Sequence, residues 1–180
     1  MAIRSILVVI SASLAAMCAA VSQARPADDA ERIWLEAHNE ARAEFGSSAL
    51  KWSDSLARDA AEWAQVLARK QQMQHASLSQ RKGQGENLWM GTRGYFAPRQ
   101  MIDSFVSERQ HFVSGQFPKV SRTGRWGDVG HYTQIVWPET RQVGCAIASG
   151  AQFDVLVCRY YPAGNMIGAY IAPKERVAKR

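Results

Sequence analysis

The spacing of apolar residues changes from a helical to a strand-like period along this chain, and that change limits the folds it can adopt. Over residues 33–45 and 54–70, apolar side chains recur every three to four positions, which is the period of an amphipathic helix. Over residues 143–147 and 152–161, short apolar runs flank a turn at Ser149-Gly150, which predicts a β-hairpin. We therefore expect one domain that combines helices with strands.

A third helix is predicted to begin at Pro98, and it carries the first sign of a functional site. Its buried stripe would contain Met101, Phe105 and Phe112. Glu108 falls on the same inward stripe, three residues after Phe105 and four before Phe112. A carboxylate on an apolar face is costly to bury unless it is paired, so Glu108 needs a partner. That partner belongs either to a functional site or to a structural ion pair.

Two further strands are expected from short apolar runs. Residues 86–90 suit one strand, and the alternation over residues 131–137 predicts another that begins at His131. The His131 ring would then project from the edge of a sheet. The polar segment 71–85 and the Gly- and Ser-rich segment 113–130 are predicted to be loops.

The N-terminus has the residue order of a secretory signal. A positive charge at Arg4 precedes an apolar stretch over residues 6–21, and small residues up to Ala24 complete a signal-peptidase site. A membrane anchor is the alternative, but a spanning helix needs about 20 strongly apolar residues, and serines interrupt this stretch. We therefore expect residues 1–24 to be a cleaved signal peptide and residues 25–180 to form a single secreted or periplasmic domain.

Removal of the signal would also remove Cys18 and leave two cysteines, Cys145 and Cys158. A lipid anchor on Cys18 is a weaker alternative, because Met17 is too large for the position before a lipidated cysteine. An even number of cysteines in an oxidising compartment suggests a disulfide, and the predicted hairpin brings the two cysteines close together. Two buried thiols are the alternative to this disulfide.

The chain is basic, with a formal net charge of +6. Such a balance favours acidic surfaces outside the cell, such as anionic lipid or polysaccharide. The sequence contains no nucleic-acid-binding motif, and its basic residues do not cluster on one predicted helix face. We expect neither nucleic-acid binding nor a membrane span in the mature chain.

Four ordered runs of this sequence are recognisable together. Residues 130–145 contain GHYTQIVW and VGC, and residues 158–165 read CRYYPAGN. Two shorter runs agree with them, HNEAR at 38–42 and GENLW at 85–89. In this order and spacing the runs resemble the CAP superfamily, or SCP-domain family, which comprises cysteine-rich secretory proteins, antigen 5 proteins and pathogenesis-related proteins. The resemblance extends over about residues 33–171.

The resemblance implies a three-layer α-β-α sandwich with a small, largely antiparallel central sheet and a cleft lined by two histidines and two glutamates. The matching positions are His75, Glu86, Glu108 and His131. Two neutral imidazoles can bind Zn²⁺, and Glu86 and Glu108 could complete the shell directly or through water, which makes a weak, exchangeable site. A metal-bound water beside Glu86 or Glu108 as a base would make the chain a hydrolase. A hydrogen-bonded structural network is the alternative to both.

Binding functions without a metal are also open. Some members of this family bind sterols or fatty acids, and the aromatic loop 89–96 with Met101 and Ile102 could line such an apolar groove. Recognition of a cell-surface or extracellular partner would leave no trace in the sequence. The run at 38–42 is expected to fasten the first helix to the sheet rather than to bind metal.

The exported protein is expected to begin at Arg25, because the small residues up to Ala24 form the cleavage site. N-terminal sequencing of exported protein should therefore read Arg25-Pro26-Ala27. A chain that begins at Met1, or one with a lipid-modified Cys18, would contradict this prediction.

Overall fold

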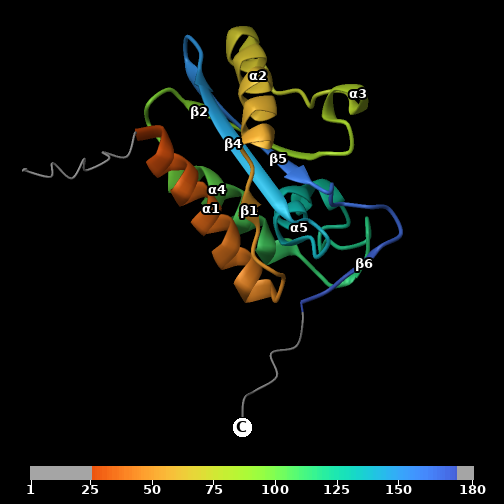
Figure 1. The fold of residues 1–180 in the computed structure, drawn as a ribbon. Helices are drawn as coiled ribbons and strands as arrows, with labels where there is room; N and C mark the ends of the chain where they lie inside the picture. The colour runs from red at the N-terminus through yellow and green to blue at the C-terminus, as the bar shows by residue number, and fades with distance from the viewer. Residues whose placement is uncertain (1–25, 174–180) are drawn as a thin grey trace, which may run out of the picture.

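A four-stranded sheet lies at the centre of the computed structural model, which describes residues 26–173; the predicted signal peptide and the C-terminal tail fall outside the described residues (Figure 1). The strand order is β1-β4-β5-β2, in which the short β1–β4 pair is parallel and the other pairs are antiparallel. The strands of this sheet are β1 (Lys51–Trp52), β2 (Gly85–Thr92), β4 (Gln142–Ser149) and β5 (Phe153–Tyr161). A smaller sheet pairs β3 (Gly115–Gln116) with β6 (Tyr170–Ile171).

Helices cover both faces of the central sheet, which confirms the three-layer α-β-α sandwich. Figure 1 shows α2 on one side of the sheet and α1 with α4 on the other. The helices are α1 (Pro26–Phe45), α2 (Asp54–Lys70), α3 (Leu78–Arg81), α4 (Pro98–Ser107) and α5 (Gly130–Val136), with 3₁₀ turns at Glu108–His111 and Trp126–Asp128.

The side chains of strand β5 pack alternately against the two helical layers. Leu156, Cys158 and Tyr160 pack in a core with α1, α4 and α5, whereas Val155 and Val157 pack against α2. Because both of its faces are buried, its apolar run is nearly continuous rather than alternating.

The two predicted N-terminal helices are confirmed. Gly46 follows α1 with a φ of 85°, the left-handed conformation in which glycine commonly ends a helix. Ser53 precedes α2, and its hydroxyl oxygen accepts a 3.4 Å hydrogen bond from the Leu56 backbone N–H, which caps the helix.

The strand predicted over residues 131–137 is wrong, because this segment is helix α5. The residues from Tyr132 to Val136 are all buried. Tyr132, Ile135 and Val136 also have the i, i+3, i+4 spacing of a helix. In so short a run the helical period cannot be distinguished from the two-residue period of a strand. His131 therefore lies in the first turn of a helix instead of opening a strand.

Helix α4 is shorter than predicted. It ends at Ser107 and passes into the 3₁₀ turn, after which Phe112 has an extended backbone. Phe112 is nevertheless buried, and its ring contacts the rings of Phe45 and Tyr132 edge-on. The predicted stripe thus holds for Met101 and Phe105, while Phe112 reaches the core from outside the helix.

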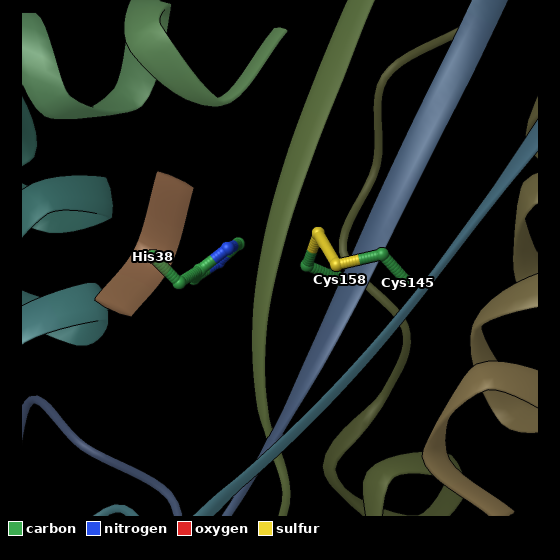
Figure 2. Close-up of side chains that lie close together, drawn as sticks. All are labelled: His38, Cys145 and Cys158. Carbon is green, nitrogen blue, oxygen red and sulfur yellow. A yellow bond between two sulfur atoms is a disulfide. The ribbon is translucent and has the colours of Figure 1, made fainter. Parts of the chain in front are cut away.

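Cys145 and Cys158 form the predicted disulfide, so the alternative of two buried thiols is wrong. The two residues lie directly opposite each other on β4 and β5, with 4.1 Å between their Cα atoms. Figure 2 shows the bond next to the ring of His38 from α1. The hairpin predicted around Ser149-Gly150 is therefore closed by a covalent bond between its strands.

Helix α1 is fastened to α5 and to neighbouring loops by Arg42, while the contact with the sheet that the run at 38–42 predicted comes from His38. The Arg42 side chain is fully buried, and burial lowers the pKa of its guanidinium to about 10, so it stays charged at neutral pH. Its nitrogens donate hydrogen bonds to four backbone carbonyls, those of Ser48 (2.6 Å), Ile135 (2.8 Å), Trp137 (2.8 Å) and Thr140 (3.0 Å).

His38 joins α1 to β5 and is hydrogen-bonded at both ring nitrogens. Nδ1 lies 2.7 Å from the Trp34 carbonyl oxygen and must donate to it, which leaves Nε2 to accept from the Tyr160 hydroxyl at 2.8 Å. The Asn87 amide donates to the same hydroxyl oxygen at 3.1 Å. Burial lowers the pKa of His38 from 6.5 to about 4, because the charged imidazolium would lose its hydration.

His38 should make the fold sensitive to acid. The unfolded chain takes up a proton at this residue below about pH 6.5, whereas the folded chain does so only near pH 4. Stability should therefore fall as the pH drops through this window and be unaffected by His38 above it, with a total loss of about 3 kcal/mol.

Guanidinium unfolding across this pH range in the wild type and in His38→Gln tests the prediction. The variant should be less stable at neutral pH, because it loses the imidazole hydrogen bonds, but its free energy of unfolding should decline less steeply with acid. Parallel declines in the two proteins would contradict the assignment.

Candidate functional site

The first histidine–glutamate pair joins the segment before α3 to strand β2. Nδ1 of His75 lies 2.7 Å from Oε1 of Glu86, and this oxygen also accepts a 3.0 Å hydrogen bond from the Ala76 backbone N–H. Helix α3 follows in a segment predicted to be a loop, and Ser77 and Gln80 cap it reciprocally. The Glu86 side chain is fully buried, whereas 56% of the His75 side chain is exposed.

The second pair joins the end of α4 to the start of α5. Nδ1 of His131 lies 2.5 Å from Oε1 of Glu108. The other Glu108 oxygen accepts hydrogen bonds from the backbone N–H groups of His131 (2.9 Å) and Tyr132 (3.1 Å), which are free because they begin a helix. Phe105 stacks on the His131 ring, with 4.7 Å between the ring centroids. The partner that Glu108 was predicted to need is therefore His131 together with two backbone amides.

Both histidines line one cleft with a volume of about 630 Å³. Glu86 also contributes to its surface, and Glu108 contacts the cleft only through His131. The structure thus brings the four residues that the sequence singled out to one region, as two pairs carried by different layers of the sandwich.

The hydrogen bonds determine which ring nitrogen of each imidazole carries the free lone pair. A carboxylate only accepts hydrogen bonds, so the nitrogen facing it, Nδ1 in both rings, must carry a proton. In a neutral ring Nε2 is then left unprotonated. Neither His75 Nε2 nor His131 Nε2 has a hydrogen-bond partner among residues 26–173. Each of the two histidines that line the cleft therefore has one ring nitrogen with a lone pair that no described residue occupies.

A different cluster, formed by His38, Cys145 and Cys158, has its donor atoms within 4.8 Å of one another (Figure 2). It cannot hold a metal as it stands, because the sulfurs form a disulfide rather than thiolates and both His38 nitrogens are hydrogen-bonded. In the described part of the chain, no other three His, Cys, Asp or Glu residues gather as closely. The two pairs in the cleft are therefore not packed into a single four-ligand cage.

Arg159 supports the first pair and was not anticipated from the sequence. It lies opposite Glu86 in the β2–β5 pairing, and its Nη2 is 3.0 Å from Glu86 Oε2. Only 3% of the Arg159 side chain is exposed, and this burial lowers its pKa while the charge of Glu86 opposes the shift. An arginine within a strand of buried residues was the signal that sequence reasoning passed over.

The mouth of the cleft is apolar, which the sequence also did not indicate. Four of its lining residues are exposed large apolar side chains: Leu78, Trp126, Met166 and Ile167. They come from α3, from a 3₁₀ turn and from the segment after β5, so only the tertiary fold gathers them. Exposed apolar side chains that cluster around a cleft commonly mark a binding surface.

The apolar groove expected near residues 89–96 is partly wrong. Met101 and Ile102 are buried in the core and cannot line an open groove. Tyr95 and Phe96 are exposed and stack edge-on, and Phe96 also contacts Trp89. None of these residues lines the cleft that holds the two histidines.

Comparison with known proteins relates this fold and cleft to one family. A profile of the cysteine-rich secretory protein family, CAP, matches residues 35–160. Pathogenesis-related protein 1C of Nicotiana tabacum is 34% identical over 151 residues, which cover 82% of this chain and 84% of that protein. Cysteine-rich secretory protein 2 of Homo sapiens is 34% identical over 158 residues, covering 81% of this chain and 61% of that protein.

Solved structures agree with the fold. The crystal structure of NaASP2 with Zn²⁺ superposes with a TM-score of 0.70 at 26% identity, covering 83% of this chain and 87% of that one. BmVAL-1 superposes with a TM-score of 0.69 at 23% identity, covering 89% of this chain and 88% of that one, which shows a shared fold.

Within residues 26–173, none of the helices combines the length and the hydropathy that a membrane span requires.

Proposed function

The chain belongs to the cysteine-rich secretory protein family, and from that premise we propose that its cleft binds a divalent cation, foremost Zn²⁺, through Nε2 of His75 and of His131. The observation that carries this proposal is the carboxylate on each Nδ1. A metal-binding histidine usually donates its other ring N–H to a carboxylate or carbonyl, which fixes the tautomer and makes the free nitrogen a better ligand. The relative NaASP2 has been crystallised with Zn²⁺, which supports the choice of ion.

Two imidazoles make an incomplete zinc site. A structural zinc ion takes four protein ligands and a catalytic one usually three, so water or a bound ligand would have to complete the shell. We therefore expect weak, exchangeable binding. In this arrangement Glu86 and Glu108 orient the histidines and do not complete the shell as ligands.

The same contacts weigh against hydrolysis by a metal-bound water. A general base needs an oxygen free to take a proton from that water. Oε1 of each glutamate already accepts from a histidine, and the remaining oxygens face Arg159 or backbone N–H groups. Binding is therefore the function that the cleft supports best.

Zinc binding is the first test of this proposal. Calorimetry of the mature domain at about pH 7.5 should show uptake of Zn²⁺. Replacing both residues, His75→Gln with His131→Gln, should abolish the uptake, while amide groups can still donate to the two carboxylates and preserve the fold.

The matched control is His111→Gln, which removes a histidine that does not line the cleft. This variant should bind zinc like the wild type. A wild-type protein that takes up no zinc would contradict the proposal and leave the two pairs as a structural network.

An apolar ligand, such as a sterol or a fatty acid, is a second candidate for the same cleft. It is favoured by the four exposed apolar side chains around the mouth, which a ligand would remove from water. A fluorescent fatty acid and a fluorescent sterol should be tested by titration, and solvent extracts of the purified protein by mass spectrometry.

Leu78→Ser combined with Ile167→Ser should weaken such binding about tenfold, because partial burial of two aliphatic side chains contributes on the order of 1 kcal/mol or more. Tyr95→Ser is the control, since Tyr95 is 76% exposed but lies outside the cleft. Equal losses in both proteins, or no ligand in the wild type, would contradict a lipid site in this cleft.

We also propose that residues 1–24 direct export and that residues 25–180 work outside the cytoplasm as one domain. The Cys145–Cys158 disulfide supports this, because disulfides persist in oxidising compartments. The secretory relative named above supports it as well. Recognition of an extracellular partner is the reading that remains if the cleft takes up neither zinc nor lipid.

A further inference from the structure

The two histidines of the cleft are oriented by supports of different kinds. Glu108 is held in place by backbone N–H groups at the start of α5, whereas Glu86 accepts one backbone hydrogen bond, from Ala76, and its other oxygen faces the guanidinium of Arg159. We infer that Arg159 is a positioning residue for His75 and acts on it through Glu86. This inference rests on the proposed metal site and adds a residue, outside the two pairs, on which its affinity depends.

The geometry places Arg159 behind Glu86. Nη2 of Arg159 lies 3.0 Å from Glu86 Oε2, and the opposite carboxylate oxygen, Oε1, faces His75 Nδ1. One oxygen is thus turned toward the cation and the other toward the imidazole. Both charged groups are almost fully buried, so neither can replace its partner with water. The contact is an ion pair, since Glu86 Oε2 accepts no hydrogen bond within the described residues.

Arg159 is itself anchored by side chains that belong to neither histidine–glutamate pair. Its Nη1 donates to Oε1 of Gln84 at 3.2 Å, and the Gln84 amide donates to Oδ2 of Asp59 on α2 at 2.6 Å. The chain of contacts therefore runs from α2 through Arg159 to the imidazole of His75. Asp59 of α2, which lies on one side of the sheet, in this way helps to set the orientation of the His75 imidazole in the cleft.

The second pair provides an internal comparison. Glu108 Oε2 accepts only backbone hydrogen bonds, and no Arg or Lys of the described chain lies within ion-pair distance of it. Replacing Arg159 should therefore disturb His75 and leave His131 unchanged. Such selectivity separates positioning from a general loosening of the fold.

Histidine tautomers report on orientation without any metal. In metal-free protein, ¹⁵N spectra of the neutral imidazoles should show His75 and His131 protonated at Nδ1. In Arg159→Met, His75 should shift toward the Nε2-protonated form, and His131 should not. Arg159→Lys keeps the positive charge but lacks the planar guanidinium, and it should give a His75 spectrum between those of the wild type and Arg159→Met.

Zinc affinity gives the second readout. Arg159→Met should weaken binding about tenfold, the lower end of the effect of removing the direct carboxylate partner of a metal-binding histidine, because Arg159 acts one contact further from the metal. Arg159→Lys should lose less affinity. A folded Arg159→Met with wild-type tautomers and wild-type affinity would overturn the inference, and so would equal changes at both histidines.

A double-mutant cycle covers the case in which Arg159→Met alone does not fold. Glu86→Gln removes the buried charge, so Glu86→Gln with Arg159→Met leaves no unpaired ion. If Arg159 acts only through Glu86, the double variant should match Glu86→Gln in His75 tautomer and in zinc affinity. A further loss in the double variant would overturn the inference. If the wild type binds no zinc, the metal proposal fails, and the tautomer spectra still decide the role of Arg159.

Discussion

The fold depends on one buried cation, Arg42, that has no carboxylate partner within residues 26–173. Arg42 satisfies its guanidinium with four backbone carbonyls, two of them at the C-terminal end of α5 and just beyond it. A buried charge of this kind is costly unless it is hydrogen-bonded, and these four bonds leave α1 and α5 little freedom to move relative to each other. The start of α5 carries His131 and supplies the amides that hold Glu108. The position of α1 therefore affects the position of His131 in the cleft, because helix α5 connects the contacts of Arg42 at its C-terminal end with His131 at its start.

The cleft joins two parts of the domain that are built independently. One wall depends on β2 and its pairing with β5, through Glu86 and Arg159. The other depends on α4 and α5, which pack in the core on the far side of the sheet from α2. Each wall presents one imidazole in a fixed tautomer. The affinity for a ligand that contacts both imidazoles consequently depends on the relative position of the two parts.

Much of this could be predicted from sequence, because the signals were local. Long periodic helices, a hairpin with its two cysteines and an inward carboxylate just after α4 all follow from residue spacing. Helix α5 was mistaken for a strand because seven residues fit either period. Arg159 and the apolar mouth were missed for another reason: their partners are distant in sequence, and no local pattern shows that Arg159 meets Glu86 or that Leu78 shares a cleft with Ile167.

The disulfide has a consequence for how faithfully the domain can assemble. Successive residues of β5 face opposite layers, so a slip of one residue in the β4–β5 pairing would exchange the environments of Arg159 and Tyr160. Arginine would then enter the aromatic core beside α1, and the tyrosine that bonds His38 would leave it. The bond between directly opposed Cys145 and Cys158 forms only in the correct register and afterwards forbids the slip. Formation of this bond thus acts as a check on the register of the strand on which both layers depend.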